Sequence, residues 1–123
     1  MTAVLDSTTA TLSDCTLASL PLRETAAMPG IEHDHTPALV QHRLPGVELD
    51  GPRTISSTRR EYWFSDSRTG SRLRLVLIYE PARGDVRCHA AESGPRSILA
   101  GLRSAFEAWT RRGRRHPARW DAP

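Results

Sequence analysis

Three strand-like segments joined by two connectors of equal length limit the fold of this chain more than any other feature. The segments are residues 60–65, 71–80 and 86–91, and the connectors are residues 67–70 and 81–84. Both connectors have four residues and end in glycine, which suits a hairpin loop built on a type I turn whose last residue has a positive φ. Proline at the start of the second connector also fits, because its φ is already that of the turn. The sequence therefore predicts an antiparallel β-meander.

Loop length fixes the register of this meander, and the register decides which side chains share a face. The first loop pairs Asp66 with Ser71, and the second pairs Glu80 with Asp85. One face of the predicted sheet is then wholly apolar: Tyr62, Phe64, Leu73, Leu75, Leu77, Tyr79, Val86, Cys88 and Ala90. The opposite face carries Glu61, Trp63, Arg72, Arg74, Val76, Ile78, Arg87 and His89. A shorter first loop would bury the carboxylate of Glu61 without a partner, which is costly.

An amphipathic helix follows the third strand. Ser93 offers an N-cap, Pro95 suits the first turn, and Gly113 supplies a left-handed stop. Between them, apolar residues recur at steps of three and four: Ile98, Leu99, Leu102, Ala105, Phe106 and Trp109. This stripe is expected to cover the apolar sheet face. The predicted fold class is α+β, with an antiparallel meander of three to five strands packed against one C-terminal helix.

The remaining segments predict flanking parts of lower order. Residues 1–30 are rich in Ser and Thr, lack a hydrophobic period and end in proline and glycine, which predicts a poorly ordered, flexible N-terminal arm. Residues 37–43 and 47–57 are each predicted to supply a short strand, the second interrupted at Asp50-Gly51-Pro52. The predicted organisation is an arm over 1–30, a single α+β domain over 31–112 and a basic tail over 113–123.

The charge of the chain is unevenly distributed. All 17 basic residues are arginine and 15 of them follow residue 50. Residues 1–50 hold two arginines against seven acids, a formal −5, whereas residues 51–123 hold fifteen against seven, a formal +8, which together give the net +3. This asymmetry favours a negatively charged partner for the C-terminal half, nucleic acid first. The absence of lysine and asparagine is typical of a GC-rich bacterial genome, so codon supply accounts for part of the arginine excess.

The polar face of the predicted sheet is the first candidate site. Trp63 lies opposite Arg74 in the predicted register, with Arg72 and Arg87 nearby. Aromatic rings interleaved with arginines can stack on bases and neutralise phosphates. Two alternatives remain open here. Trp63 and Arg74 can form a cation–π pair on a solvated face, or residues 1–57 can cover this face.

The C-terminal segment is the second candidate site. It carries five arginines in a short stretch: Arg111, Arg112, Arg114, Arg115 and Arg119. Phosphate contacts from such a segment would give salt-sensitive affinity without sequence readout. A solvated chain end is the alternative. The complete set of predicted nucleic-acid-binding residues is Trp63, Arg72, Arg74, Arg87, Arg111, Arg112, Arg114, Arg115 and Arg119.

The sequence gives little support to metal or cofactor chemistry. His33 and His35 lie two residues apart beside Glu32 and Asp34, but a third and fourth ligand at a recognisable spacing are missing, so no metal site is predicted. No phosphate-binding glycine loop or nucleophile motif occurs. Cys88 falls on the apolar face, where a thiol is inert. We therefore expect neither a cofactor nor an enzyme.

Localisation follows from what the chain lacks in its sequence. Its longest apolar run, residues 75–79, is far short of the roughly 20 residues of a membrane helix, and acids near the start argue against a signal peptide. Two cysteines could form one disulfide, but free thiols are the simpler interpretation. The expectation is a cytoplasmic protein with no membrane role.

Together these features predict a small, non-enzymatic regulatory or accessory protein. Its nucleic-acid interface would combine the Arg/Trp sheet face with the basic tail. The competing hypothesis is a protein-interaction module that docks a partner or forms a homodimer through the outer sheet face or the N-terminal arm, with no nucleic-acid role.

Overall fold

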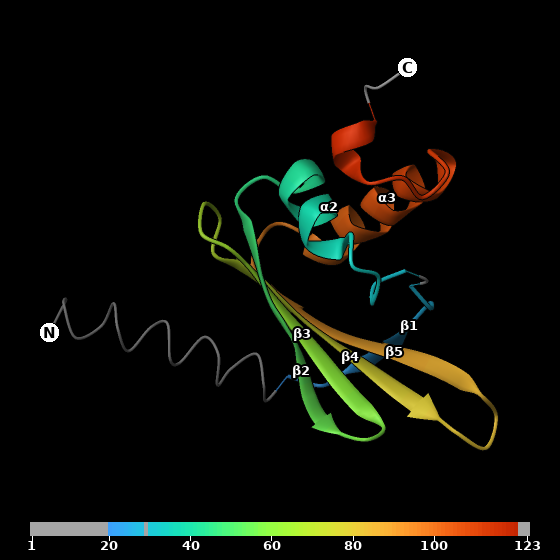
Figure 1. Ribbon diagram of the computed structural model, residues 1–123. Coiled ribbons are helices and arrows are strands. Elements are labelled where there is room, and N and C mark those ends of the chain that lie inside the picture. Colours follow the sequence, from blue (N-terminus) through green and yellow to red (C-terminus); the bar gives the residue numbers. More distant parts are fainter. Residues whose placement is uncertain (1–19, 29, 121–123) are drawn as a thin grey trace, which may run out of the picture.

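The computed structural model describes residues 20–28 and 30–120 (Figure 1). They form a five-stranded antiparallel sheet in the order β1-β5-β4-β3-β2, with two α-helices on one side of it. The strands are β1 (Arg23–Thr25), β2 (Val47–Ser56), β3 (Arg59–Asp66), β4 (Ser71–Glu80) and β5 (Asp85–Ser93). The helices are α2 (Thr36–Arg43), α3 (Ile98–Arg111) and the short 3-10 helix η1 (Pro117–Arg119). The α+β class, the meander and the C-terminal helix are confirmed.

The register of the central strands is the predicted one. Asp66 pairs with Ser71 across the first hairpin and Glu80 with Asp85 across the second. Both loops end in glycine with a positive φ, 76° at Gly70 and 67° at Gly84. Because each loop has the length and the left-handed residue that its turn requires, local chemistry alone fixes which side chains face the helices.

Helix α3 lies on the apolar face of β3, β4 and β5 as predicted. The buried residues of this helix include Ile98, Leu102, Phe106 and Trp109, and they form one core with Phe64, Leu75 and Leu77 from the sheet. The N-cap is Ser97, whose hydroxyl accepts from the amide of Ala100. The predicted cap, Ser93, was wrong because this residue still pairs with Arg72 at the end of β5.

The prediction of a strand over residues 37–43 was wrong, because this segment is helix α2. Pro37 occupies the first turn, where a missing N–H costs nothing. Leu39 and Val40 face the core, and the two helices approach closely because Gly101 has no side chain: a Cβ there would overlap Leu44. A segment this short has too few apolar residues to distinguish the two periods.

The ordered domain begins upstream of the predicted boundary at residue 31. Residues 23–25 form β1, which pairs with β5 through Arg23 and Ala90, and Met28 is buried. The outer edge of β5 needs partners for its backbone groups, and β1 supplies them. Residues 1–19 and 29 of the predicted arm lie outside the described residues.

The C-terminal segment was predicted as a basic tail, and its described residues 113–120 include two that are buried. Pro117 and Trp120 are buried, and the indole nitrogen of Trp120 donates to the carbonyl of Arg115 at 2.9 Å. The chain after α3 therefore folds back on the helices, as Figure 1 shows at the top of the molecule. Residues 121–123 lie outside the described part. No helix within the described ranges has the length and hydropathy needed to cross a bilayer.

Replacing Phe106 by alanine tests the core. Its side chain is 5% exposed and its ring packs edge-on against Trp109 with centroids 6.1 Å apart. We expect the free energy of unfolding to fall by about 3–5 kcal/mol, measured by urea denaturation. Thr110→Ala, on the exposed side of the same helix, is the control and should change stability little. A Phe106→Ala variant as stable as this control would contradict the core assignment.

Candidate nucleic-acid interface

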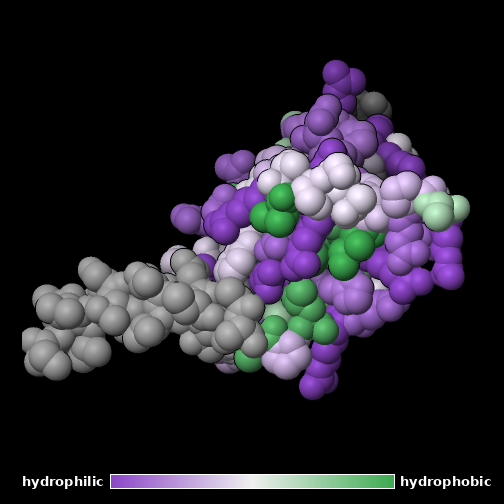
Figure 2. Space-filling view, turned by 90° about the horizontal axis from the view of Figure 1, so that it is seen from below, coloured by the Kyte–Doolittle hydropathy of each residue, from purple (hydrophilic) through white to green (hydrophobic). Residues whose placement is uncertain are grey.

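The outer face of the sheet, away from the helices, carries the predicted residues Trp63, Arg72, Arg74 and Arg87. Viewed from that side, the molecule is mostly hydrophilic with separate hydrophobic patches (Figure 2). The described part of residues 20–57 supplies β1 and β2 at the two edges of the sheet and α2 on the helix side (Figure 1). Within residues 20–28 and 30–57, no strand or helix lies across the outer face of the central strands, although Glu61 and Val76 on that face are buried.

Arg74 is held by a buried carboxylate on this face. Glu61 is 5% exposed, and its two oxygens accept from Nε and Nη2 of Arg74 at 2.9 and 3.2 Å. Arg59 donates a further bond to Oε2 at 3.2 Å. Burial raises the pKa of Glu61, but the hydrogen bonds and charges of Arg74 and Arg59 outweigh it and hold the pKa below its usual value. Arg74 is thus paired within the sheet, and it shares the single negative charge of Glu61 with Arg59.

Trp63 lies under two guanidinium groups. The guanidinium carbons of Arg53 and Arg74 are 4.9 and 5.6 Å from the centroid of its ring, both within cation–π distance. The cation–π pair of Trp63 and Arg74, one of the two alternatives from the sequence, is therefore present. A nucleobase could stack on the ring only where these groups leave it open.

The other charges of the sheet are also largely paired. Arg87 lies 3.2 Å from a carboxylate oxygen of Glu80, which Arg83 approaches to 3.9 Å. Arg53 forms an ion pair with Asp50, and Arg72 is half-buried. The register thus brings the predicted sheet residues to one face, but it also places carboxylates beside them that pair with most of their arginines.

The arginines near the C-terminus form a different surface. The C-terminal basic cluster consists of Arg43, Arg111, Arg112, Arg114, Arg115 and Arg119, all exposed. Within residues 20–28 and 30–120, no carboxylate forms an ion pair with any of the six. Arg43 belongs to α2 and was missed, since its segment was predicted as a strand.

Two tryptophans support this cluster from below. Trp120 is 7% exposed, and the guanidinium carbons of Arg112 and Arg43 lie 4.8 and 5.9 Å from its ring centroid. Arg114 lies 5.6 Å from the ring of Trp109. The three guanidinium groups thus lie within cation–π distance of buried rings while their side chains stay exposed, which restricts their positions at the surface.

The backbone after α3 reverses at two left-handed residues. Gly113 has a φ of 72° and Arg114 a φ of 60°, and the amide of Arg114 donates to the carbonyl of Trp109 at 2.8 Å. A non-glycine residue in this region costs about 1–2 kcal/mol, and such positions are frequent at functional sites. The reversal brings the arginines of residues 114–119 beside those at the end of the helix.

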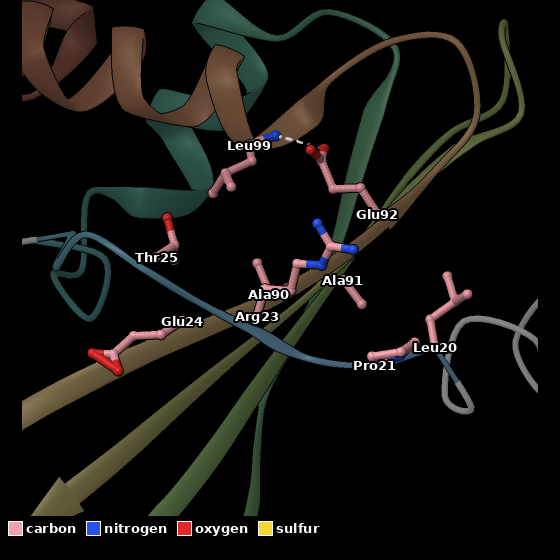
Figure 3. Close-up of a pocket in the computed structure, with 9 residues that line it drawn as sticks. All are labelled: Leu20, Pro21, Arg23, Glu24, Thr25, Ala90, Ala91, Glu92 and Leu99. Carbon is pink, nitrogen blue, oxygen red and sulfur yellow. Dashed lines mark hydrogen bonds between the residues drawn. The ribbon is translucent and has the colours of Figure 1, made fainter.

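A pocket of about 430 Å³ lies between β1, β5 and the start of α3 (Figure 3). One of its three charged lining residues, Glu92, accepts from the amide of Leu99 and the hydroxyl of Ser97, both at 3.0 Å. Glu92 therefore accepts hydrogen bonds from the N-terminus of α3, where its negative charge also complements the helix dipole. Among the described residues, no group of three or more ligating side chains has metal-site geometry, His33 and His35 included.

Comparison with known proteins adds no relative: no protein-family model, curated protein or solved structure matches the chain.

Replacing Arg74 by methionine tests the buried ion pair. The side chains of Arg74 and Glu61 are 12% and 7% exposed, so the variant leaves a carboxylate with Arg59 alone. We expect a loss of about 3 kcal/mol in the free energy of unfolding, measured by urea denaturation at neutral pH. Arg83→Met is the matched control, because this exposed arginine lies 3.9 Å from its partner.

The double variant Glu61→Leu/Arg74→Met should recover much of that loss, since no charge is then left buried without a partner. Equal stability of Arg74→Met and Arg83→Met would contradict the role given to the pair.

Proposed function

We propose that this protein is a small, non-enzymatic regulatory or accessory protein of the bacterial cytoplasm that binds nucleic acid through its C-terminal basic cluster. One observation carries the proposal. The six exposed arginines of the cluster share one end of the molecule, and none has an ion-pair partner among the described residues.

The chemistry of the cluster favours a phosphate backbone. Guanidinium groups bind phosphate oxygens in a bidentate manner, and each neutralised phosphate releases counterions into solution. The rings of Trp109 and Trp120 hold three of the six guanidinium groups in place, so less side-chain entropy is lost on binding. This supports a sequence-independent interface whose affinity depends strongly on salt.

The outer sheet face is assigned a smaller part in the same function. Its arginines Arg74 and Arg87 already bind Glu61 and Glu80, so a phosphate would have to compete with a carboxylate for each. Trp63 and Arg72 stay predicted contacts of this face, which lies on the opposite side of the sheet from the helices and the C-terminal basic cluster. Such contacts would add stacking to the affinity for single strands.

A charge-matched pair of variants tests the location of the interface. Replacing Arg114, Arg115 and Arg119 by glutamine should lower the affinity for every DNA sequence alike. The slope of log K against log salt concentration should become less steep by about two to three units. The control replaces Arg53, Arg60 and Arg83 by glutamine, which removes the same charge from arginines that lie near carboxylates and are not predicted contacts. Binding is measured by fluorescence anisotropy of labelled DNA at several salt concentrations.

Two results would contradict the proposal. An equal loss of affinity in both variants would mean that net charge alone attracts the nucleic acid and that the cluster is no site. No detectable binding of DNA or RNA at about 50 mM salt, where screening is weak, would rule out the function and favour a protein-interaction module.

A further inference from the structure

Three histidines from two distant segments meet beside the C-terminal basic cluster. His33 and His35 precede α2, and His116 follows α3. The ring centroid of His35 lies 4.3 Å from that of His33 and 5.0 Å from that of His116. Trp109 forms the floor of this histidine cluster, with its ring 4.9 Å from His33 and 6.2 Å from His35.

The hydrogen bonds of the histidine cluster require neutral rings. Nδ1 of His33 accepts from the amide of His35 at 3.1 Å, and Nδ1 of His116 accepts from the amide of Ala118 at 3.1 Å. A protonated imidazole has no acceptor nitrogen, so protonation would break both contacts. Nδ1 of His35 is buried and has no hydrogen-bond partner in the part of the chain that the structure describes, so a proton there would be an unsatisfied donor.

The surrounding charges oppose protonation further. Burial is the main cause that lowers the pKa of His35, a positive charge on His33 or His116 would lower it further, and the charge of Asp34 partly opposes them. Two arginines of the C-terminal basic cluster are also close. The guanidinium of Arg114 lies over the same Trp109 ring that His33 contacts, and Arg115 precedes His116 in the chain. The acidic groups near the three rings are Asp34 and Glu32, which adjoin His33 in the chain, and Glu32 is paired with Arg60 at 2.6 Å.

We propose that the histidine cluster takes up protons when nucleic acid binds at the C-terminal basic cluster, so that affinity increases as the pH falls below neutrality. This inference rests on the proposed function. A phosphate bound by Arg114, Arg115 or Arg119 would bring negative charge next to His116, which lies between them in the chain. Because the linkage between two ligands is reciprocal, acidification strengthens the binding of the anion to the same extent.

The free protein should respond to pH in the opposite sense. The pKa of His35 is lower in the folded state than the ordinary value of 6.5, so the unfolded chain binds this proton more readily. The contribution of His35 to stability is therefore complete above about pH 6.5 and declines as the pH falls from there towards the folded-state pKa. Bound nucleic acid should reduce this decline.

Anisotropy titrations with a labelled DNA duplex at about pH 7.5 and about pH 5.5 test the linkage. At constant ionic strength we expect binding up to about tenfold tighter at the lower pH, which is the limit for one group whose pKa rises by one unit on binding. The double variant His35→Gln/His116→Gln should bind as the parent does at the higher pH and gain little on acidification. His89→Gln, a change in β5 opposite Val76 and away from the cluster, is the control that should keep the pH response.

Calorimetric titration of the unchanged protein in two buffers of different ionisation enthalpy counts the protons taken up, whether or not the variants fold. Measurable binding with equal affinity at both pH values and no proton uptake would overturn the linkage and leave the proposed function standing. Loss of the pH response in His89→Gln would place the protons outside the histidine cluster and overturn it too. Absence of binding at both pH values would overturn the linkage and the proposed function together.

Discussion

The contact between α3 and the apolar face of β3, β4 and β5 positions every other element of this protein. Leu73, Leu75 and Leu102 are almost wholly inaccessible to solvent, and burial of such surface is the main favourable term in folding. Helix α2 packs against α3 where Gly101 permits the approach of Leu44. Residues 114–120 then find their place on the two helices rather than on the sheet.

The two ends of α3 carry side chains of opposite charge. At the N-terminus, Ser97 and Glu92 satisfy the first amides of the helix and place a negative charge where the helix dipole favours one. At the C-terminus, positive side chains gather around Trp120, and they too complement the dipole. The helix is thus stabilised at both ends, and its C-terminal end is left with charge in excess of what the fold requires.

The parts of the structure that could be predicted from the sequence are those fixed by short-range chemistry. The register of Trp63 and Arg74 follows from one loop length, and the buried stripe of α3 follows from helical period. Helix α2 is eight residues long and β1 three, too short for a period to identify either. The pairing of Arg74 with Glu61 and the burial of Trp120 depend on contacts in three dimensions, so the sequence alone did not predict them. For the same reason the sequence indicated the arginines of the candidate interface, Arg43 excepted, but not which of them are paired with carboxylates.

Among the described residues, the first strand, β1, pairs with the last, β5. Contact between Arg23 and Ala90 closes a loop that contains almost the whole domain, and the entropy of closing it is recovered only after the intervening strands are in place. β1 therefore docks late in folding, and with three residues it is the strand most easily lost by local opening. Its departure would leave β5 as a bare edge, open to a strand from another chain. The pairing of β1 with β5 therefore also keeps part of the β5 backbone from pairing with a strand of another chain.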